Sequence, residues 1–359
     1  MRPGPAARPG GPLTTKGERM ERAGFGVIGT GLFGENHARV FSRTPGVELV
    51  AICDQNEARA REVAERYGAR RVYTDHHDLL ADPAIRAVSI ATPDFAHAEI
   101  AMAAAAAGKD ILCEKPLATT VEEAQAIVDA ANRAGVKLMV DFHNRVNPPL
   151  VAARDRVRDG SIGTPAYGYA RLSNTTFVPT EMLRWANRTS ALWFLGSHAV
   201  DIMRFILDDT VVRVQAVTRS GILRQLGVDV PDFHVAIAEF SRGAVVTFEH
   251  AWILPRSQPM VYDFKVELLG SEGAVYVDTS HNGTATVHAG GRMDYVDVLG
   301  ATPTSDLRTG GFVAEAIAQF TDAVLYDRPV LATGEDGVEA TRIVAAIQQS
   351  ADTGRAVDL

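Results

Sequence analysis

A glycine-rich turn after an apolar run restricts what this chain can fold into more than any other feature. The turn Gly29-Thr30-Gly31-Leu32-Phe33-Gly34 follows the apolar run 25–28. In a strand–turn–helix unit the first glycine permits a tight turn, the second lets the backbone approach a pyrophosphate, and the third lets the helix pack closely on the strand. The free N–H groups of the helix N-terminus then face the phosphates. The pattern predicts a dinucleotide site that includes Gly29, Gly31, Leu32, Phe33 and Gly34.

An acidic residue at the end of the next apolar run indicates which dinucleotide is bound. Asp54 follows the run 49–53 and lies 20 residues after Gly34. That spacing is typical of a carboxylate that accepts hydrogen bonds from the adenosine ribose diol. A carboxylate there would repel a 2′-phosphate, so we expect NAD(H) rather than NADP(H).

Apolar runs alternate with helical patterns from residue 24 to about 145, which predicts an α/β fold with a doubly wound parallel sheet. We assign residues 23–146 to this Rossmann domain. The expected strands are 25–29, 48–53, 87–91, 110–113 and 137–142, and the expected helices are 33–43, 56–67, 95–107 and 120–134. The last helix should begin at a capping box, Thr120 with Glu123, and end at Gly135.

The pattern changes after Pro148-Pro149, and we assign residues 147–359 to a second α/β domain. Several strand-like runs alternate apolar and polar residues, which predicts a mainly antiparallel sheet with helices on one face and the other face open. An open, half-apolar face usually finds a partner, so we expect a homo-oligomer, a dimer or tetramer formed through it. The expected strands are 166–173, 211–219, 232–240, 244–253, 262–269 and 273–277, and the expected helices are 151–158, 312–326 and 335–352.

Composition excludes several classes of protein. The 359 residues carry a net charge of −8 and a pI near 5.7, which argues against a nucleic acid or an anionic membrane as partner. The two cysteines, Cys53 and Cys113, lie in apolar runs and predict neither a disulfide framework nor a zinc site. The histidines are not spaced as metal ligands, so no metal is expected. Residues 1–22 are rich in Pro, Gly and Arg and lack an apolar segment, which favours a disordered extension over a signal peptide. We therefore expect a cytoplasmic protein.

Two segments carry side chains suited to proton transfer. Lys115, in Glu114-Lys115-Pro116, follows an expected strand whose carboxyl end should face the cofactor, and desolvation could make it a base; alternatively it forms a surface pair with Glu114. His198 and Asp201 are three residues apart and share a helix face. The histidine could carry the proton of a hydroxyl, or it could be a buried histidine at a helix start.

Asp201 and three further residues are candidates for substrate binding. Asn144 follows the expected strand 137–142 and could bind a hydroxyl, although polar residues at strand ends are often turn formers. Arg184 and Arg188 are four residues apart and could meet on one helix face to bind an anionic group, or could lie in a solvated loop.

Taken together and in order, these motifs resemble the Gfo/Idh/MocA oxidoreductases, the relatives of glucose–fructose oxidoreductase and inositol dehydrogenase. The motifs that carry the resemblance are the glycine turn with Asp54, Ala91-Thr92-Pro93 with His97, Glu114-Lys115-Pro116 and Gly196-x-His198-x-x-Asp201. The resemblance extends from residue 24 to the C-terminus. It implies a Rossmann domain, an open-faced α/β domain, and NAD(P)-linked oxidation or reduction of sugars, polyols and their derivatives. Lys115 matches the family's lysine beside the nicotinamide and His198 its catalytic histidine. The positions that match cofactor-lining residues are Thr92, Pro93, His97 and Glu114.

The chain departs from the family at one position. Many of its sugar and inositol dehydrogenases carry an Asp four residues before the histidine, which completes a Lys–Asp–His relay, and here that residue is Phe194. The leading hypothesis is an NAD-dependent dehydrogenase acting on a sugar, polyol or sugar derivative, with Lys115 and His198 handling the proton. The alternative is an NAD-dependent glycoside hydrolase that works by transient ring oxidation, elimination, water addition and re-reduction, on an anionic sugar glycoside for example. A cofactor-binding regulator without turnover is disfavoured because it would be expected to lose the lysine and the histidine.

Overall fold

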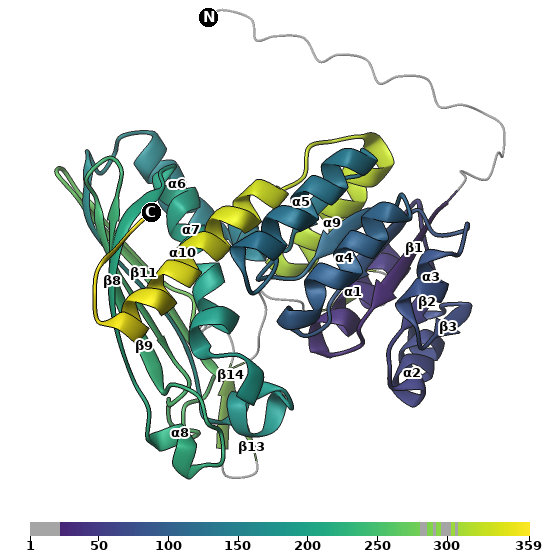
Figure 1. Cartoon of the computed structure of the whole chain (residues 1–359), viewed down its shortest axis with the longest axis horizontal. Coiled ribbons are helices and arrows are strands. Elements are labelled where there is room, and N and C mark those ends of the chain that lie inside the picture. The colour runs from purple at the N-terminus through teal and green to yellow at the C-terminus, as the bar shows by residue number, and fades with distance from the viewer. Residues whose placement is uncertain (1–21, 281–285, 290–291, 296–302, 306–307) are drawn as a thin grey trace, which may run out of the picture.

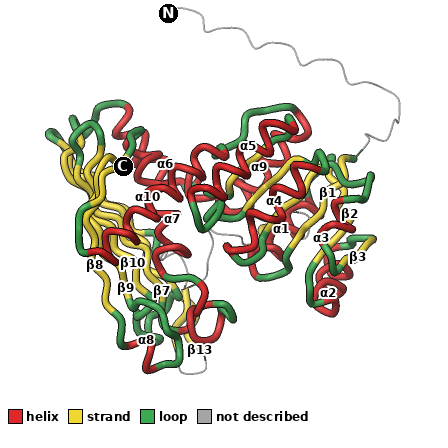
Figure 2. Tube along the Cα trace, viewed as in Figure 1, coloured by secondary structure: helices red, strands yellow, loops and turns green. Residues whose placement is uncertain are grey.

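The computed structural model describes residues 22–280, 286–289, 292–295, 303–305 and 308–359. They form two sheets with their helices, side by side (Figure 1, Figure 2). The expected disordered extension, residues 1–22, lies outside the described residues apart from Arg22. None of the described helices is long and apolar enough to cross a membrane.

The first sheet is parallel, with the strand order β3-β2-β1-β4-β5-β6. The order reverses between β1 and β4, which is where a doubly wound sheet binds its ligand. All five expected strands are present; β3, only three residues long, was missed. The strands are β1 (Ala23–Ile28), β2 (Val47–Cys53), β3 (Arg71–Tyr73), β4 (Ala87–Ile90), β5 (Asp110–Cys113) and β6 (Leu138–Val140).

The helices of this domain begin and end where the local sequence indicates. The Thr120 hydroxyl accepts a hydrogen bond from the Glu123 N–H at the start of α5, and Gly135 ends that helix in the left-handed conformation. The expected helix 95–107 is divided into a 3₁₀ turn, η1 (Asp94–Ala96), and α4. The helices are α1 (Leu32–Arg43), α2 (Glu57–Tyr67), α3 (His76–Leu80), α4 (His97–Ala106) and α5 (Val121–Ala134).

The second sheet has the order β12-β11-β7-β10-β9-β8-β17, and every pair in it is antiparallel except β7 with β10. Figure 1 shows α7 and α10 on one face of this sheet, as expected, while the described helices leave the other face open. The last strand, β17, was not expected. Its strands are β7 (Pro165–Asn174), β8 (Val211–Arg219), β9 (Phe233–Phe240), β10 (Val245–Ala251), β11 (Tyr262–Gly270), β12 (Ala274–Asp278) and β17 (Val357–Asp358).

The remaining elements are the helices, single turns and small hairpins that follow β6. The helices after β6 are α6 (Pro148–Arg158), α7 (Ser197–Leu207), α8 (Ile222–Gln225), α9 (Phe312–Tyr326) and α10 (Gly334–Thr353), with single turns η2 (His143–Val146), η3 (Val178–Met182), η4 (Ala186–Arg188) and η5 (Leu192–Gly196). Two small hairpins pair β13 (Thr286–Ala289) with β14 (Arg292–Tyr295) and β15 (Pro303–Ser305) with β16 (Arg308–Thr309).

The two closing helices do not belong to the second domain alone, although the sequence analysis placed both there. Helix α9 packs in the Rossmann core, where the Phe320 ring lies 6.0 Å from that of Phe25. Helix α10 contacts both α5 and β8 and so joins the domains. Its start packs closely on the first domain, because a Cβ at Gly334 or Gly337 would lie 2.7–2.8 Å from side chains of the parallel sheet and its neighbours.

Candidate active site

The glycine turn has the geometry that a dinucleotide requires. Gly29 has φ +92°, and a Cβ on Gly34 would lie 1.9 Å from the Gly29 carbonyl oxygen, so neither position accepts a side chain. At Gly31 a Cβ would meet nothing within 4 Å, which leaves open space beside the backbone where α1 begins. Nearby, Thr92 Oγ1 is buried without a hydrogen-bond partner in the described structure. The turn therefore fits a cofactor with phosphates at the start of α1 and a polar group near Thr92.

Asp54 is held at the end of β2 and points to the same turn. Its Oδ2 accepts hydrogen bonds from the N–H and the hydroxyl of Thr30, at 2.7 and 2.6 Å, and its Oδ1 accepts one from the Asn56 N–H at 2.8 Å. A carboxylate oxygen can accept more than one hydrogen bond, so these contacts orient Asp54 without using up its acceptors.

Lys115 is buried where β5 ends. Its Nζ donates a 2.8 Å hydrogen bond to the carbonyl oxygen of Phe194 and lies 4.4 Å from the centre of that ring. Burial lowers the pKa of Lys115, while the charge of Glu114 and of other carboxylates opposes the shift. The lysine that the sequence analysis weighed as a surface residue is only 7% exposed, and it reaches from the first domain to the second.

His198 lies in the first turn of α7, close to Lys115 and His143. Burial and the positive charges of Lys115 and His143 lower its pKa well below the usual value, so the imidazole is neutral at pH 7. Its Nδ1 is 3.4 Å from Nδ2 of Asn144, and its ring centre is 4.7 Å from that of His143. The His143 ring in turn stacks on Phe33 of the cofactor turn at 5.9 Å.

Asn144 is 5% exposed and faces His198, so its main contact in the structure is with a candidate catalytic side chain. His97 links two loops of the Rossmann domain, with ring nitrogens 2.7 and 3.0 Å from the carbonyl oxygens of Pro116 and Thr92.

A buried cluster beneath the cofactor turn was missed by the sequence analysis. His37 Nε2 lies 3.3 Å from Glu114 and 3.4 Å from Asp141, and its Nδ1 is 2.5 Å from the Ser89 hydroxyl. The two carboxylates raise the pKa of His37 to about 9 against the opposing effect of burial, and the pKa of Asp141 is lowered. The signal was available in principle: His37 lies on the sheet side of α1, and Glu114 and Asp141 end neighbouring parallel strands.

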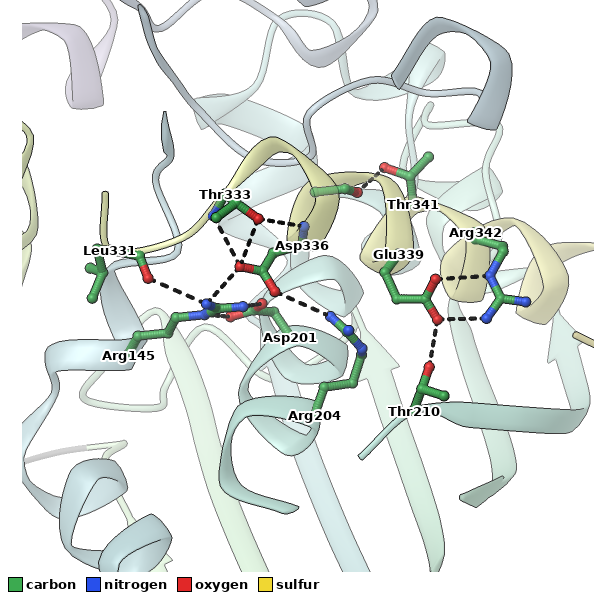
Figure 3. A network of polar contacts seen from close by, with 11 residues as sticks. Arg145, Asp201, Arg204, Thr210, Leu331, Thr333, Asp336, Glu339, Thr341 and Arg342 are labelled. Atoms are coloured by element: carbon green, nitrogen blue, oxygen red, sulfur yellow. Dashed lines mark hydrogen bonds and ion pairs between the residues drawn. The ribbon is translucent and has the colours of Figure 1, made fainter. Parts of the chain in front are cut away.

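Asp201 is not placed to bind a substrate, contrary to the prediction. Its two carboxylate oxygens accept hydrogen bonds from Nε and Nη2 of Arg145, at 2.9 and 2.5 Å, and the residue is 1% exposed. Figure 3 shows that Arg145 also binds Asp336 of α10, at 2.9 Å, and the Leu331 carbonyl oxygen. Arg145 therefore ties η2, α7 and α10 together, and Asp201 is a structural partner in that tie.

Arg184 and Arg188 do not share a helix face, so that prediction was wrong in its geometry. Residues 184–185 form a turn and η4 is a 3₁₀ turn. The chain leaves the helical path because the Asn187 side chain accepts a hydrogen bond from the Asp229 N–H and the Thr189 hydroxyl donates one to Asp94. The guanidinium of Arg188 lies 3.4 Å from the centre of the Phe95 ring.

Comparison with known proteins places the chain in a family. Residues 23–142 match the model of an oxidoreductase family with an NAD-binding Rossmann fold, and residues 150–276 match the C-terminal domain model of GFO/IDH/MocA proteins. The chain belongs to the Gfo/Idh/MocA oxidoreductase family. This confirms the resemblance, the fold class and the NAD-binding Rossmann domain.

The relatives include dehydrogenases of a polyol and of a sugar derivative. The chain is 30% identical to "scyllo-inositol 2-dehydrogenase (NAD(+))" of Bacillus subtilis (strain 168), over 73% of this chain and 75% of the relative, and 30% identical to "Uncharacterized oxidoreductase YrbE" of the same organism, over 93% and 96%. Among solved structures, levoglucosan dehydrogenase in complex with NADH and levoglucosan is 28% identical with a TM-score of 0.79, covering 94% of this chain and 99% of that one. GenD2 from gentamicin A biosynthesis, in complex with NAD, is 29% identical with a TM-score of 0.82, covering 97% and 99%. This is thus a family of NAD-dependent sugar and polyol oxidoreductases.

Proposed function

We propose that this protein is an NAD-dependent dehydrogenase of a sugar, polyol or sugar derivative, in which Lys115 and His198 handle the hydroxyl proton. The observation that carries the proposal is the convergence of these two buried side chains from different domains. Lys115 Nζ bonds the carbonyl of Phe194, four residues before His198, and His143 stacks between His198 and the cofactor turn. NAD, when bound, supplies the nicotinamide that accepts or returns a hydride.

The chain's own residues supply the acid–base part of the reaction. Burial lowers the pKa of Lys115, which brings its proton exchange closer to neutral pH, and keeps His198 neutral. Both side chains are buried, and a site with little water around the reacting carbon favours hydride transfer over side reactions.

The first experiment is to mix purified protein with NAD and a panel of free sugars, polyols, sugar acids and glycosides, and to follow NADH by its absorbance. Steady formation of NADH with a free sugar or polyol supports the proposal. Lys115→Ala should abolish turnover and leave NAD binding nearly unchanged. The matched control is Lys137→Ala, which removes a lysine paired with Asp327 outside the site. Wild-type turnover in Lys115→Ala would refute the assignment of Lys115.

The glycosidase hypothesis remains a second candidate because Phe194 stands at the position of the relay Asp. Its prediction differs in one observable: glycoside is cleaved only when NAD is present, yet no NADH accumulates. The same panel measures it, with released sugar assayed beside NADH. Cleavage that persists after bound NAD is removed would refute this mechanism.

We also propose that the open face of the second sheet joins copies of this chain into a dimer or tetramer. Large apolar side chains remain exposed on the strands of that sheet: Val217 51%, Ile237 50% and Tyr276 68%. Patches of this kind mark interaction surfaces in soluble proteins. Light scattering after gel filtration should give a multiple of the chain mass, and Ile237→Asp should reduce it. A monomeric wild-type protein would refute the proposal.

A further inference from the structure

The side chain next to His198 fixes the position of its proton. Asn144 Nδ2 faces His198 Nδ1 at 3.4 Å, and both residues are buried, at 5% and 6% exposure. An amide nitrogen is only a donor, so the nitrogen it faces must offer a lone pair. Neutral imidazole has one N–H, which is then left on Nε2.

We propose that Asn144 is a positioning residue that holds His198 as the neutral Nε2–H tautomer. The two groups of the proposed function then have unequal shares in handling the hydroxyl proton: His198 donates a hydrogen bond to the reacting oxygen, and Lys115 takes up or returns the proton. This deepens the proposed function and rests on it for the identity of the reacting oxygen. In the oxidation, the hydroxyl proton passes to the lone pair of neutral Lys115 Nζ, and the hydride of the same carbon goes to the oxidised nicotinamide. In the reduction, the lysine ammonium returns that proton.

The surroundings of His198 support the neutral form. The nearby ionisable groups are Lys115 at the end of β5 and His143 in η2, and both disfavour a second proton on His198. The carboxylates around it are engaged elsewhere: Asp141 with His37 and His143, and Asp201 and Asp336 with Arg145. His250 of β10 packs against Gly196, just before α7, and its pKa is lowered to about 4.

The same geometry explains how the chain works with Phe194 at the relay position. Phe194 offers only its backbone carbonyl, which accepts from Lys115 Nζ at 2.8 Å and orients the lysine. A carbonyl cannot take up a proton, so it cannot pass one from lysine to histidine. A division of roles, with Lys115 exchanging the proton and His198 donating a hydrogen bond, needs no group between them.

The test is the nitrogen NMR spectrum of the histidines in the full-length protein with NAD bound. The His198 signals are assigned by their loss in His198→Asn. We expect a pyridine-like Nδ1 and a pyrrole-like Nε2 at pH 7. In Asn144→Asp the new carboxylate accepts a hydrogen bond from Nδ1–H, which moves the single proton of the neutral ring to Nδ1, so the two signals should exchange character. A pyrrole-like Nδ1 in the wild-type protein would overturn the proposal. The wild-type spectrum therefore tests the tautomer even if Asn144→Asp does not fold.

The pH profile gives a second readout that a merely structural role would not move. A carboxylate beside Nδ1 raises a histidine pKa by about 1–3 units, so the pH at which the His198 nitrogen signals titrate should move up by at least one unit in Asn144→Asp. The matched control is Asn132→Asp, the same charge change at an exposed residue of α5. An unshifted titration of the His198 signals in Asn144→Asp would overturn the proposal. The NMR result needs no substrate, so it separates failure of this inference from failure of the proposed function.

Discussion

The buried His37–Glu114–Asp141 cluster predicts how the stability of this protein depends on pH. The His37 side chain is fully buried, and its pKa is raised from 6.5 to about 9 by the two carboxylates. Because the pKa is higher in the folded protein, the stabilisation is fully present below pH 6.5 and is lost as the pH rises through about 9. Between these values the folded state holds one proton that the unfolded state has released.

The magnitude follows from linkage. One proton of difference gives a slope of about −1.4 kcal/mol per pH unit in the free energy of unfolding, or on the order of 3 kcal/mol over the full range. The measurement should stop at about pH 8.5 because of the two cysteines. Burial raises the pKa values of the Cys53 and Cys113 thiols in the folded protein, so these thiols ionise first in the unfolded chain and then lower the free energy of unfolding with pH as His37 does.

The assay is urea unfolding at constant ionic strength between pH 6.5 and 8.5, with the His37 pKa measured by NMR. The control is the double variant His37→Gln/Asp141→Asn, which removes the cation and one of its carboxylates together and leaves no like-charge pair. Wild-type protein should lose stability with pH more steeply than the control, by about 1.4 kcal/mol per unit. A His37 that titrates near pH 6.5, or equal slopes in the two proteins, would refute the reasoning.

Three further predictions test the cofactor turn and the tie between domains. Gly31→Ala adds a methyl group to open space in the protein but blocks the pyrophosphate, so NAD affinity measured by calorimetry should fall at least about tenfold while stability in urea is unchanged. Gly34→Ala, whose Cβ would clash with Gly29, should lower both the NAD affinity and the stability. Equal behaviour of the two variants would contradict the assigned turn geometry. Asp54→Ala should narrow the preference for NADH over NADPH measured by fluorescence titration, and an unchanged ratio would remove Asp54 from the selection. Arg145→Met leaves Asp201 as an uncompensated buried charge and should cost about 3–5 kcal/mol of unfolding free energy; Arg61→Met, which breaks an exposed pair with Glu57, should cost under about 1 kcal/mol and is its control.

Features that depend on neighbouring residues could be predicted from the sequence. The glycine turn, Asp54 and the cap of α5 are local patterns, and the structure has each where it was expected. β3 was missed because three residues, one of them exposed, carry too little apolar pattern. Strand β17 was missed because two residues at the chain end have no pattern of their own and pair with β8, far away in the sequence.

The errors in the site share one cause: spacing along the chain was used where contacts across the fold decide. Arg184 and Arg188 were expected to meet on one helix face or to lie in a loop. The helix is absent because Asn187 accepts a hydrogen bond from the Asp229 N–H and Thr189 donates one to Asp94, both in distant segments. Asp201 shares a helix face with His198 and was a candidate for substrate binding, but Arg145, 56 residues away, donates hydrogen bonds to both of its carboxylate oxygens.

Arg145 also shows why the two domains form one site. It follows Asn144 in η2, and its partner Asp201 follows His198 by one turn in α7, so the ion pair and the Asn144–His198 contact align the same two segments. The third partner, Asp336, lies in the first turn of α10, which packs on both domains. A buried bidentate ion pair has a narrow range of favourable geometry. It can therefore hold His198 of one domain within reach of Lys115 of the other. A hydrophobic contact of the same size has no preferred direction and would fix the relative orientation of the two segments less strictly.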